Sequence, residues 1–402
     1  MSETAETAPA ADPLRSVHTT SFPELLAHLG ASVLVTTYQA GKLVVLRNDG
    51  GVLNTHFRNL AKPMGLAVAG GKLAIGCSVD IWEFHNVPAV CSKLDQSDDY
   101  PTRVAKHDGC FLPRRSHCTG DVQIHEMAWV GQRADGRRQK AANGVAPSSS
   151  PSPADGGGGL SDLVFVNTAF SCLSTRSEQN SFEPAWRPQF ISKLVPGDNC
   201  HLNGLAVRDG KVRYVTALGE TDTPGGWREN KRDGGLLIEI ESNAIVARSL
   251  SMPHSPRWYR DRLWLLESGK GTFGWIDLAS GRYEPVVELP GFTRGLSFAG
   301  PWAFIGLSQV RESAIFSGIP LVERLEERIC GVWVVNIESG QIAAFCRFED
   351  AVQEIFAVEV LPGMQYPDLI NHDADLIGRS YVLGDAALRE VPEDLRSTGR
   401  GQ

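Results

Sequence analysis

The sequence has no lysine- or arginine-rich tract, no long apolar run and no CxxC pair. It has 402 residues and a formal net charge of −8. An acidic chain without a basic cluster argues against nucleic acid or an anionic membrane as a partner. No stretch approaches the length that spans a bilayer, and residues 1–16 lack the apolar centre of a secretory signal. We therefore predict a cytoplasmic protein.

The well-marked enzyme motifs are also missing. There is no phosphate-binding loop, no GxGxxG, no HExxH and no EF-hand loop, and Ser171 has no GxSxG elbow around it. The eight cysteines are dispersed, and in a reducing compartment they are most simply small buried side chains. Any chemistry must therefore be assembled from residues that are far apart in the sequence.

What the sequence does contain is a repeat. Six short segments resemble one another and each opens an apolar run, which is usually followed by a Gly or Asp turn and a second run. The segments are residues 63–68, 124–129, 202–207, 253–258, 293–298 and 353–358. Strands that repeat every roughly 40–60 residues are typical of a β-propeller. We predict an all-β, six-bladed β-propeller.

The repeat also predicts how the chain is organised. A hairpin at 33–38 and 42–46 precedes the first copy, and a leading hairpin of this kind completes the last blade of a closed ring. We expect it to pair with strands at 354–361 and 380–383. The predicted units are a disordered arm at 1–20, one propeller at 21–391 and a disordered tail at 392–402. The propeller carries a low-complexity insertion at 131–160 and a partly helical one at 307–330.

The second residues of the six segments form a predicted ring around one end of the central channel. They are Met64, His125, Asn203, His254, Arg294 and Glu354. Two imidazoles and one carboxylate are a ligand set for iron, zinc or copper. We predict His125, His254 and Glu354 as metal ligands, with Asn203 adding a carbonyl oxygen. Arg294 would hold an anionic substrate group.

Two neighbours of this ring are further candidates. His201 lies two residues before Asn203, which places both side chains on one face of a strand. Glu126 follows His125, and either Asp121 or Glu126 could orient that imidazole. We assign Arg294, His201 and Glu126 as the predicted catalytic residues.

Several phrases resemble a bacterial family of conserved hypothetical proteins. They are HCTGDxxxHE, FVNTxFSCLST, CHLNGLA and SMPHSPR, and the resemblance covers roughly residues 31–362. It identifies relatives and not a chemistry. Asn203–Gly204–Leu205–Ala206 is also distantly similar to a phrase of gluconolactonase and senescence-marker-type six-bladed propellers, in which it supplies a ligand to a divalent cation. His125 and His254 stand where those enzymes have oxygen ligands, which favours a transition metal.

These observations leave three interpretations of the ring. The first is a metal-dependent enzyme, a hydrolase or an oxygenase, that acts on a small polar or anionic molecule. The second is a non-enzymatic propeller that binds a peptide, a protein or a metabolite on its loop face. The third is a polar channel mouth with a purely structural role.

Overall fold

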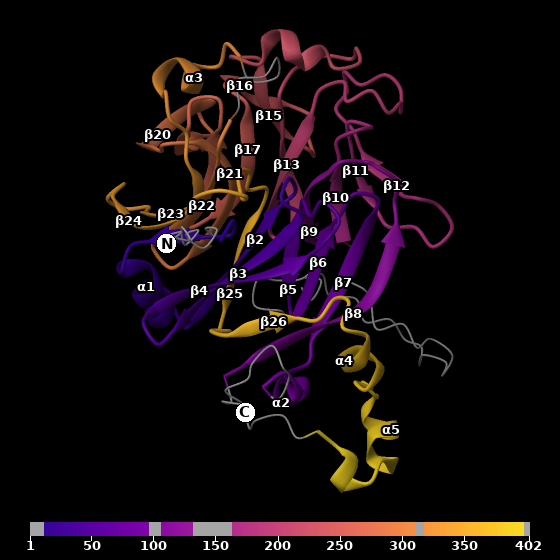
Figure 1. The fold of residues 1–402 in the computed structure, drawn as a ribbon. Coiled ribbons are helices and arrows are strands. Elements are labelled where there is room, and N and C mark those ends of the chain that lie inside the picture. The colour runs from indigo at the N-terminus through magenta and orange to yellow at the C-terminus, as the bar shows by residue number, and fades with distance from the viewer. Residues whose placement is uncertain (1–11, 96–105, 132–162, 311–316, 398–402) are drawn as a thin grey trace, which may run out of the picture.

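Six β-sheets are arranged around one axis as the blades of a propeller (Figure 1). The computed structural model describes residues 12–95, 106–131, 163–310 and 317–397, and every structural statement below refers to these. The predicted fold class is confirmed. Each of the six repeated segments contributes to the innermost strand of a blade or to the turn before it. Apolar faces of neighbouring blades pack together, as Phe304 and Val33 do, and such burial supplies most of the stabilising free energy.

In the first three blades the strands follow one another along the chain from the axis outward, except that the C-terminal strand β26 is added outside β8 in blade 1. Blade 1 contains β5 (Leu66–Ala69), β6 (Lys72–Gly76), β7 (Asp80–Asn86), β8 (Gly109–Cys118) and β26 (Pro367–Leu369). Blade 2 contains β9 (Ile124–Trp129), β10 (Leu163–Asn167), β11 (Cys172–Thr175) and β12 (Glu183–Trp186). Blade 3 contains β13 (Leu202–Arg208), β14 (Lys211–Ala217), β15 (Gly235–Glu239) and β16 (Ile245–Leu250).

The other three blades are built in the same way, and the N-terminal strands enter blades 5 and 6. Blade 4 contains β17 (Pro253–Tyr259), β18 (Arg262–Glu267), β19 (Thr272–Asp277) and β20 (Arg282–Glu288). Blade 5 contains β21 (Phe292–Ala299), β22 (Trp302–Ser308), β23 (Cys330–Asn336), β24 (Ile342–Phe348) and β1 (Ser16–His18). Blade 6 contains β25 (Val358–Pro362), β2 (Ala31–Thr37), β3 (Lys42–Asp49) and β4 (Val52–Asn59).

Helices are few and short. They are α1 (Ser21–Leu29), η1 (Pro88–Val90), α2 (Cys91–Leu94), η2 (Gly226–Asn230), α3 (Pro320–Arg324), α4 (Ala374–Gly378), α5 (Asp385–Glu390) and η3 (Glu393–Leu395). Helix α3 bears out the predicted helical part of the insertion at 307–330. Among the described residues, no helix is both long enough and apolar enough to cross a bilayer.

Hydroxyl groups join neighbouring blades in a repeated way. In four blades a Ser or Thr at the end of the second strand donates to a main-chain carbonyl where the next innermost strand begins. The pairs are Thr36 with Met64, Thr168 with Leu202, Ser268 with Thr293, and Ser308 with Ile355. The turns that lead into the innermost strands are also alike. In four of the six repeated segments, a residue with left-handed backbone lies two positions before the ring residue of that segment. These residues are Lys62, Gln123, His201 and Met252.

The ring is closed in blade 6, as predicted for the hairpin. Strand β2 pairs with β25 over Ala31–Val35 and Val358–Pro362, and β3 and β4 continue the sheet outward. The prediction of a strand at 380–383 is wrong. Those residues lie between α4 and α5, and Tyr381 is 81% exposed. Blade 6 is already complete, because three N-terminal strands join β25 and leave no place beside it.

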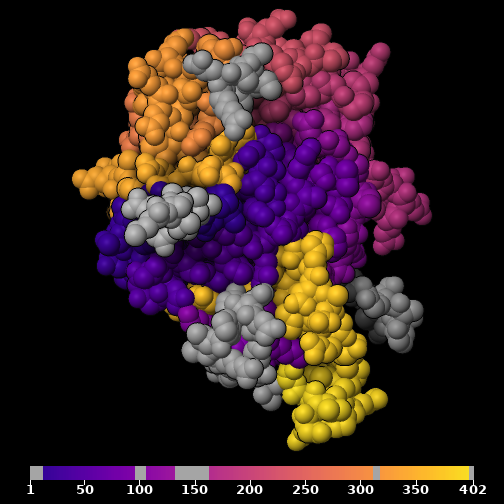
Figure 2. Space-filling view, in the orientation of Figure 1, coloured from indigo at the N-terminus to yellow at the C-terminus, as the bar shows by residue number. Residues whose placement is uncertain are grey.

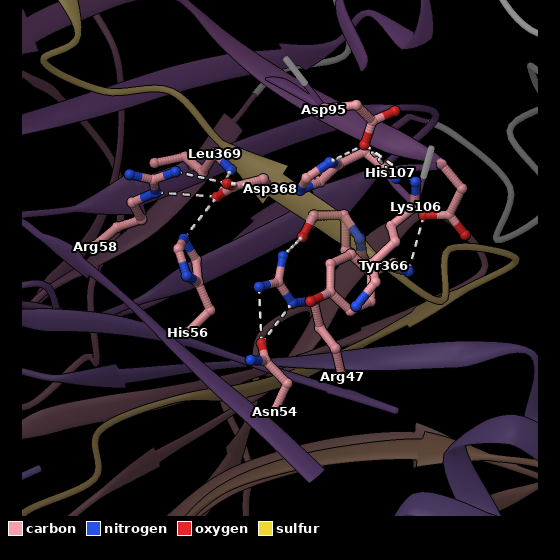
Figure 3. A network of polar contacts seen from close by, with 12 residues as sticks. Arg47, Asn54, His56, Arg58, Asp95, Lys106, His107, Tyr366, Asp368 and Leu369 are labelled. Carbon is pink, nitrogen blue, oxygen red and sulfur yellow. Dashed lines mark hydrogen bonds and ion pairs between the residues drawn. The ribbon is translucent and has the colours of Figure 1, made fainter. Parts of the chain in front are cut away.

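The junction between blade 6 and blade 1, here called the seam, is also closed by the C-terminal strand β26, which contacts both blades (Figure 3). Strand β26 runs parallel to β8 of blade 1. Its buried Asp368 accepts from Arg58 Nε at 3.0 Å and lies 3.1 Å from His56 Nε2, both on β4 of blade 6. Arg47 of β3 donates to the Pro367 carbonyl and lies 3.9 Å from the ring centre of Tyr366. Polar groups thus join the first and the last blade.

The two ends of the chain correct the predicted domain limits. In the predicted arm 1–20, Ser16–His18 form β1, which pairs with β24 because that outer strand otherwise leaves main-chain groups unpaired. Residues 1–11 lie outside the described part. After β26 the chain forms α4, α5 and η3, none of which has a buried residue, and they project from the propeller (Figures 1 and 2). The propeller strands therefore end at Leu369, not at 391. The insertion at 131–160 lies almost wholly outside the described residues.

Candidate functional site

The starts of the innermost strands gather polar side chains at one end of the channel, here called the ring end. His125 lies on β9, His254 on β17 and Arg294 on β21. His201 precedes β13, and its ring centre lies 4.7 Å from that of His125. Tyr38 follows β2, while Glu354 and Phe356 precede β25. The structure thus brings five predicted residues, His125, His201, His254, Arg294 and Glu354, to one end.

His125 and His254 are anchored in the same way. His125 Nδ1 lies 3.0 Å from the Gln123 carbonyl and 2.8 Å from the Thr168 hydroxyl. His254 Nδ1 lies 2.9 Å from both the Met252 carbonyl and the Ser268 hydroxyl. A carbonyl only accepts, so each Nδ1 carries the hydrogen and each Nε2 keeps a lone pair.

Burial and a nearby cation keep these two imidazoles neutral. Burial, and next the positive charge of Arg294, hold the pKa of His125 and of His254 well below the ordinary value. Both side chains are therefore uncharged at neutral pH. Their Nε2 atoms are hydrogen-bond acceptors, not acids.

Arg294 is the one cation of the ring, and it has no anionic contact. Its guanidinium lies 3.5 Å from the centre of the Phe356 ring. Within the described part of the chain it forms no ion pair and no hydrogen bond. Burial lowers its pKa to about 10, against the opposite effects of Tyr38, Glu354 and Glu126. Arg294 therefore stays positively charged at pH 7, and an enclosed charge without a partner is unfavourable.

The carboxylate of Glu354 is engaged by Tyr38 instead. Burial, followed by a hydrogen bond to Glu354, raises the pKa of Tyr38 to about 12. The phenol therefore keeps its proton at neutral pH, so toward the carboxylate its O–H can act only as a hydrogen-bond donor. The ring of Tyr38 also meets Phe356 edge-on, with centres 5.6 Å apart. Tyr38 and Phe356 were not identified from the sequence, although Phe356 lies two residues after the predicted Glu354.

His201 is held by a carboxylate. Its Nδ1 lies 2.9 Å from Asp198 Oδ1 and 3.0 Å from Oδ2. Trp227 packs on His201 with ring centres 4.5 Å apart and donates from Nε1 to Asp198 at 3.0 Å. The pair resembles the carboxylate–histidine arrangement that orients an imidazole in acid–base catalysis. Asp198 was missed, because its only sequence signal is its position three residues before His201.

Two predicted site residues serve other contacts. Asn203 donates from Nδ2 to the Pro253 carbonyl at 3.0 Å and accepts from Thr216 at 2.7 Å, which joins blades 3 and 4. Glu126 does not contact His125. It forms an ion pair with Arg257 and accepts from the Leu205 N–H at 2.7 Å. Successive strand residues alternate in direction, so the Glu126 side chain points away from that of His125.

A family model described as a domain of unknown function, DUF4915, matches residues 20–143 and 156–370. The chain belongs to the DUF4915 family. The matched range ends just after β26, so α4 and α5 lie beyond the DUF4915 domain. No curated protein matches the sequence.

Two solved structures are similar to this DUF4915 chain at low identity. A crystal structure of a nidogen/laminin complex has 9% identity and a TM-score of 0.49, and covers 83% of this chain and 99% of that one. A catalytically inactive virginiamycin B lyase from Staphylococcus aureus with quinupristin has 12% identity and a TM-score of 0.37, with 84% and 100% covered. At this level of similarity neither bears on the chemistry of the ring end.

The predicted metal ligands of the DUF4915 chain do not form a metal-binding group. Among the described residues, no three His, Cys, Asp or Glu side chains are placed to hold one ion. Glu354 lies close enough to Tyr38 to raise its pKa, and Asn203 donates to the Pro253 carbonyl of blade 4. The donor set therefore does not fit an iron, zinc or copper ion in this arrangement, and a bound transition metal stays a prediction from the sequence.

Proposed function

We propose that the ring end binds a small anionic molecule, most simply a carboxylate. The observation that carries this proposal is Arg294, a half-buried cation without an anionic contact in the described structure. A guanidinium presents five donors in a plane and suits a carboxylate bidentately. A bound anion would supply the charge that the protein itself does not.

The neighbours of Arg294 narrow the class of ligand. His125 and His254 offer Nε2 lone pairs, which pair with O–H or N–H groups and not with a second anion. A molecule with a carboxylate and an adjacent hydroxyl or ammonium group satisfies both sets. Small hydroxy acids and amino acids are therefore the proposed ligands. The cytoplasmic location, a protein partner and the likeness to gluconolactonase-type propellers stay predictions.

The test compares matched ligands and matched variants by isothermal titration calorimetry. Lactate and alanine should bind, and lactamide, the uncharged amide of similar shape to lactate, should bind at least about tenfold more weakly because a charge-assisted hydrogen bond is lost. Arg294→Gln should remove this preference. Arg260→Gln, which changes an exposed arginine paired with Glu338, is the control. Equal binding of lactate and lactamide, or an unchanged Arg294→Gln variant, would contradict the proposal.

Acid–base catalysis at the same site is a second candidate, favoured by the Asp198–His201 pair. His201 would transfer a proton to or from a molecule held by Arg294, with no metal required. In an assay of lactones and hydroxy-acid esters followed by pH-stat, Asp198→Asn should lower kcat by about 10²–10⁴-fold while lactate affinity stays the same. Turnover that Asp198→Asn leaves unchanged would contradict this role. Elemental analysis of protein purified without a histidine tag tests the predicted metal separately.

A further inference from the structure

A pocket lies at the opposite end of the channel from the ring residues, here called the far pocket. It has a volume of about 200 Å³, and all its lining residues belong to innermost strands. Its walls include Met127 and Trp129 of β9, Val207 of β13 and Trp258 of β17. These positions follow the ring residues along the same strands, so the far pocket opens at the other end.

Charged side chains close the far pocket on its inner side. Arg257 Nη1 pairs with Glu126 Oε1 at 2.5 Å, and Arg257 Nη2 lies 3.5 Å from Glu359 Oε1. Glu126 is also fixed by the Leu205 N–H. This ion-pair layer lies between the far pocket and the ring end, so the two ends of the channel are separate sites.

The ion-pair layer at the inner side of the far pocket contains two carboxylates and one guanidinium. Two enclosed carboxylates share one guanidinium, and Glu126 takes the shorter contact. Glu359 keeps only the longer contact and a hydrogen bond from Ser297 at 3.1 Å. Burial raises the pKa of Glu359 to about 7. An ionised Glu359 therefore lacks a full counter-charge, and it lines the far pocket itself.

We infer that the far pocket binds a small organic ammonium ion. The ammonium group would lie against Glu359, and the apolar body against Trp129 and Trp258. Indole rings favour such ligands, because their faces attract cations and their area buries carbon. Cations of the protein already lie near both indoles: Arg208 is 4.0 Å from the ring centre of Trp258, and Lys72 and Arg176 are 5.3 and 5.7 Å from that of Trp129. The ligand's charge must therefore be placed by Glu359, and the remaining room suits one ring or a few methyl groups. A volume of about 150 Å³ is enough for benzene.

Three probes of one shape test the charge requirement. Benzylammonium should bind, and benzyl alcohol and benzoate should bind at least about tenfold more weakly, as expected for one lost charge-assisted contact. Calorimetry gives the affinity, and indole N–H signals in NMR report whether Trp129 and Trp258 respond. Benzyl alcohol binding as tightly as benzylammonium, or no binding of benzylammonium at millimolar concentrations, would overturn the inference.

Variants then locate the site. Glu359→Gln keeps the shape and the contact with Ser297 but removes the charge, so benzylammonium affinity should fall at least about tenfold. Ala128→Leu places a larger side chain in the far pocket without altering the ion-paired residues, and it should abolish benzylammonium binding. This variant tests the site if Glu359→Gln fails to fold. Glu338→Gln, on the exposed surface, is the control. Arg294→Gln should leave benzylammonium affinity unchanged. Loss of benzylammonium binding in this variant would place the ligand at the ring end instead.

Discussion

Arg294 and Arg257 show how one residue type is used differently at two depths of the channel. Arg257 lies between Glu126 and Glu359, and the nearby carboxylates raise its pKa despite burial. Arg294 has Phe356 beneath it and no carboxylate in contact, and burial lowers its pKa. The first arginine is satisfied by the protein, whereas the second has donors left for a ligand. Only the three-dimensional arrangement separates these roles.

At the same scale, Asp368 should be one of the most sensitive single residues for stability. Its carboxylate is buried between Arg58 and His56, and these contacts hold its pKa well below the ordinary range. Asp368→Asn should lower the free energy of unfolding at pH 7 by about 3–5 kcal/mol, because it removes the buried negative charge that Arg58 and His56 contact. Urea unfolding followed by circular dichroism measures this change.

The pH dependence of that difference follows from the direction of the shift. A depressed pKa stabilises the fold above the unfolded value of about 3.9, and this contribution is lost as the pH falls through the folded value. The difference in the free energy of unfolding between wild type and Asp368→Asn should therefore be constant from pH 7 to about 5 and should become smaller below about pH 4. Glu284→Gln, in an exposed pair with Arg282, should change stability by less than about 0.5 kcal/mol. A variant as stable as this control would show that the Asp368 contacts contribute little.

At the scale of single elements, the sequence predicts strands well and the partners of each strand less well. The innermost strands were found because their openers repeat in the same register, from Pro63 to Gln353. Strand β1 was missed because Ser16–His18 is short and carries no repeat, and only the free edge of β24 makes it a strand. Residues 380–383 have an apolar pattern, yet every strand position near them is already filled.

For the candidate site too, the sequence predicted the positions of residues better than their contacts. Shared register placed His125, His254, Arg294 and Glu354 at one end of the channel. It did not reveal that Asn203 would bind the next blade, since that depends on the position of Pro253 about fifty residues later. Tyr38 could not be predicted as a site residue, because it comes to the ring end only when β2 pairs with β25 in blade 6.

Two C-terminal truncations test which late element is structural. Ending the chain after Ile370 removes α4 and α5, which have no buried residue, so the melting temperature should change by only a few degrees. Ending it after Met364 also removes β26 with Asp368, and should lower the melting temperature by more than about 10 °C, the combined effect of a lost strand and a broken buried ion pair. Differential scanning calorimetry compares the two. Equal losses would mean that the helices, and not β26, stabilise the seam.

At the scale of the whole molecule, stability depends on a ring that is closed twice at one seam. Blade 6 joins β25 to three N-terminal strands, and β26 crosses back to blade 1 beside them. A closed ring has no free inner edge, so each blade is covered on both faces. Removing a segment at the seam should therefore affect every blade, whereas removing a segment elsewhere should affect only its own connection.

Two deletions of similar length test this expectation. Removing β2 and β3, residues 31–49, takes away buried Val33, Val35 and Val44 and leaves β25 unpaired, so we expect aggregated protein or loss of the cooperative transition. Replacing residues 137–158 by a short Gly/Ser linker should shift the melting temperature by only a few degrees. Strands β9 and β10 on either side pair directly, from Trp129 to Leu163, and connection length has a weak effect on stability. Sedimentation velocity and calorimetry on both variants decide the matter. A soluble, cooperatively folded protein without β2 and β3 would show that the propeller does not need its seam, and unfolding of the linker variant would show that the inserted residues contribute to the core.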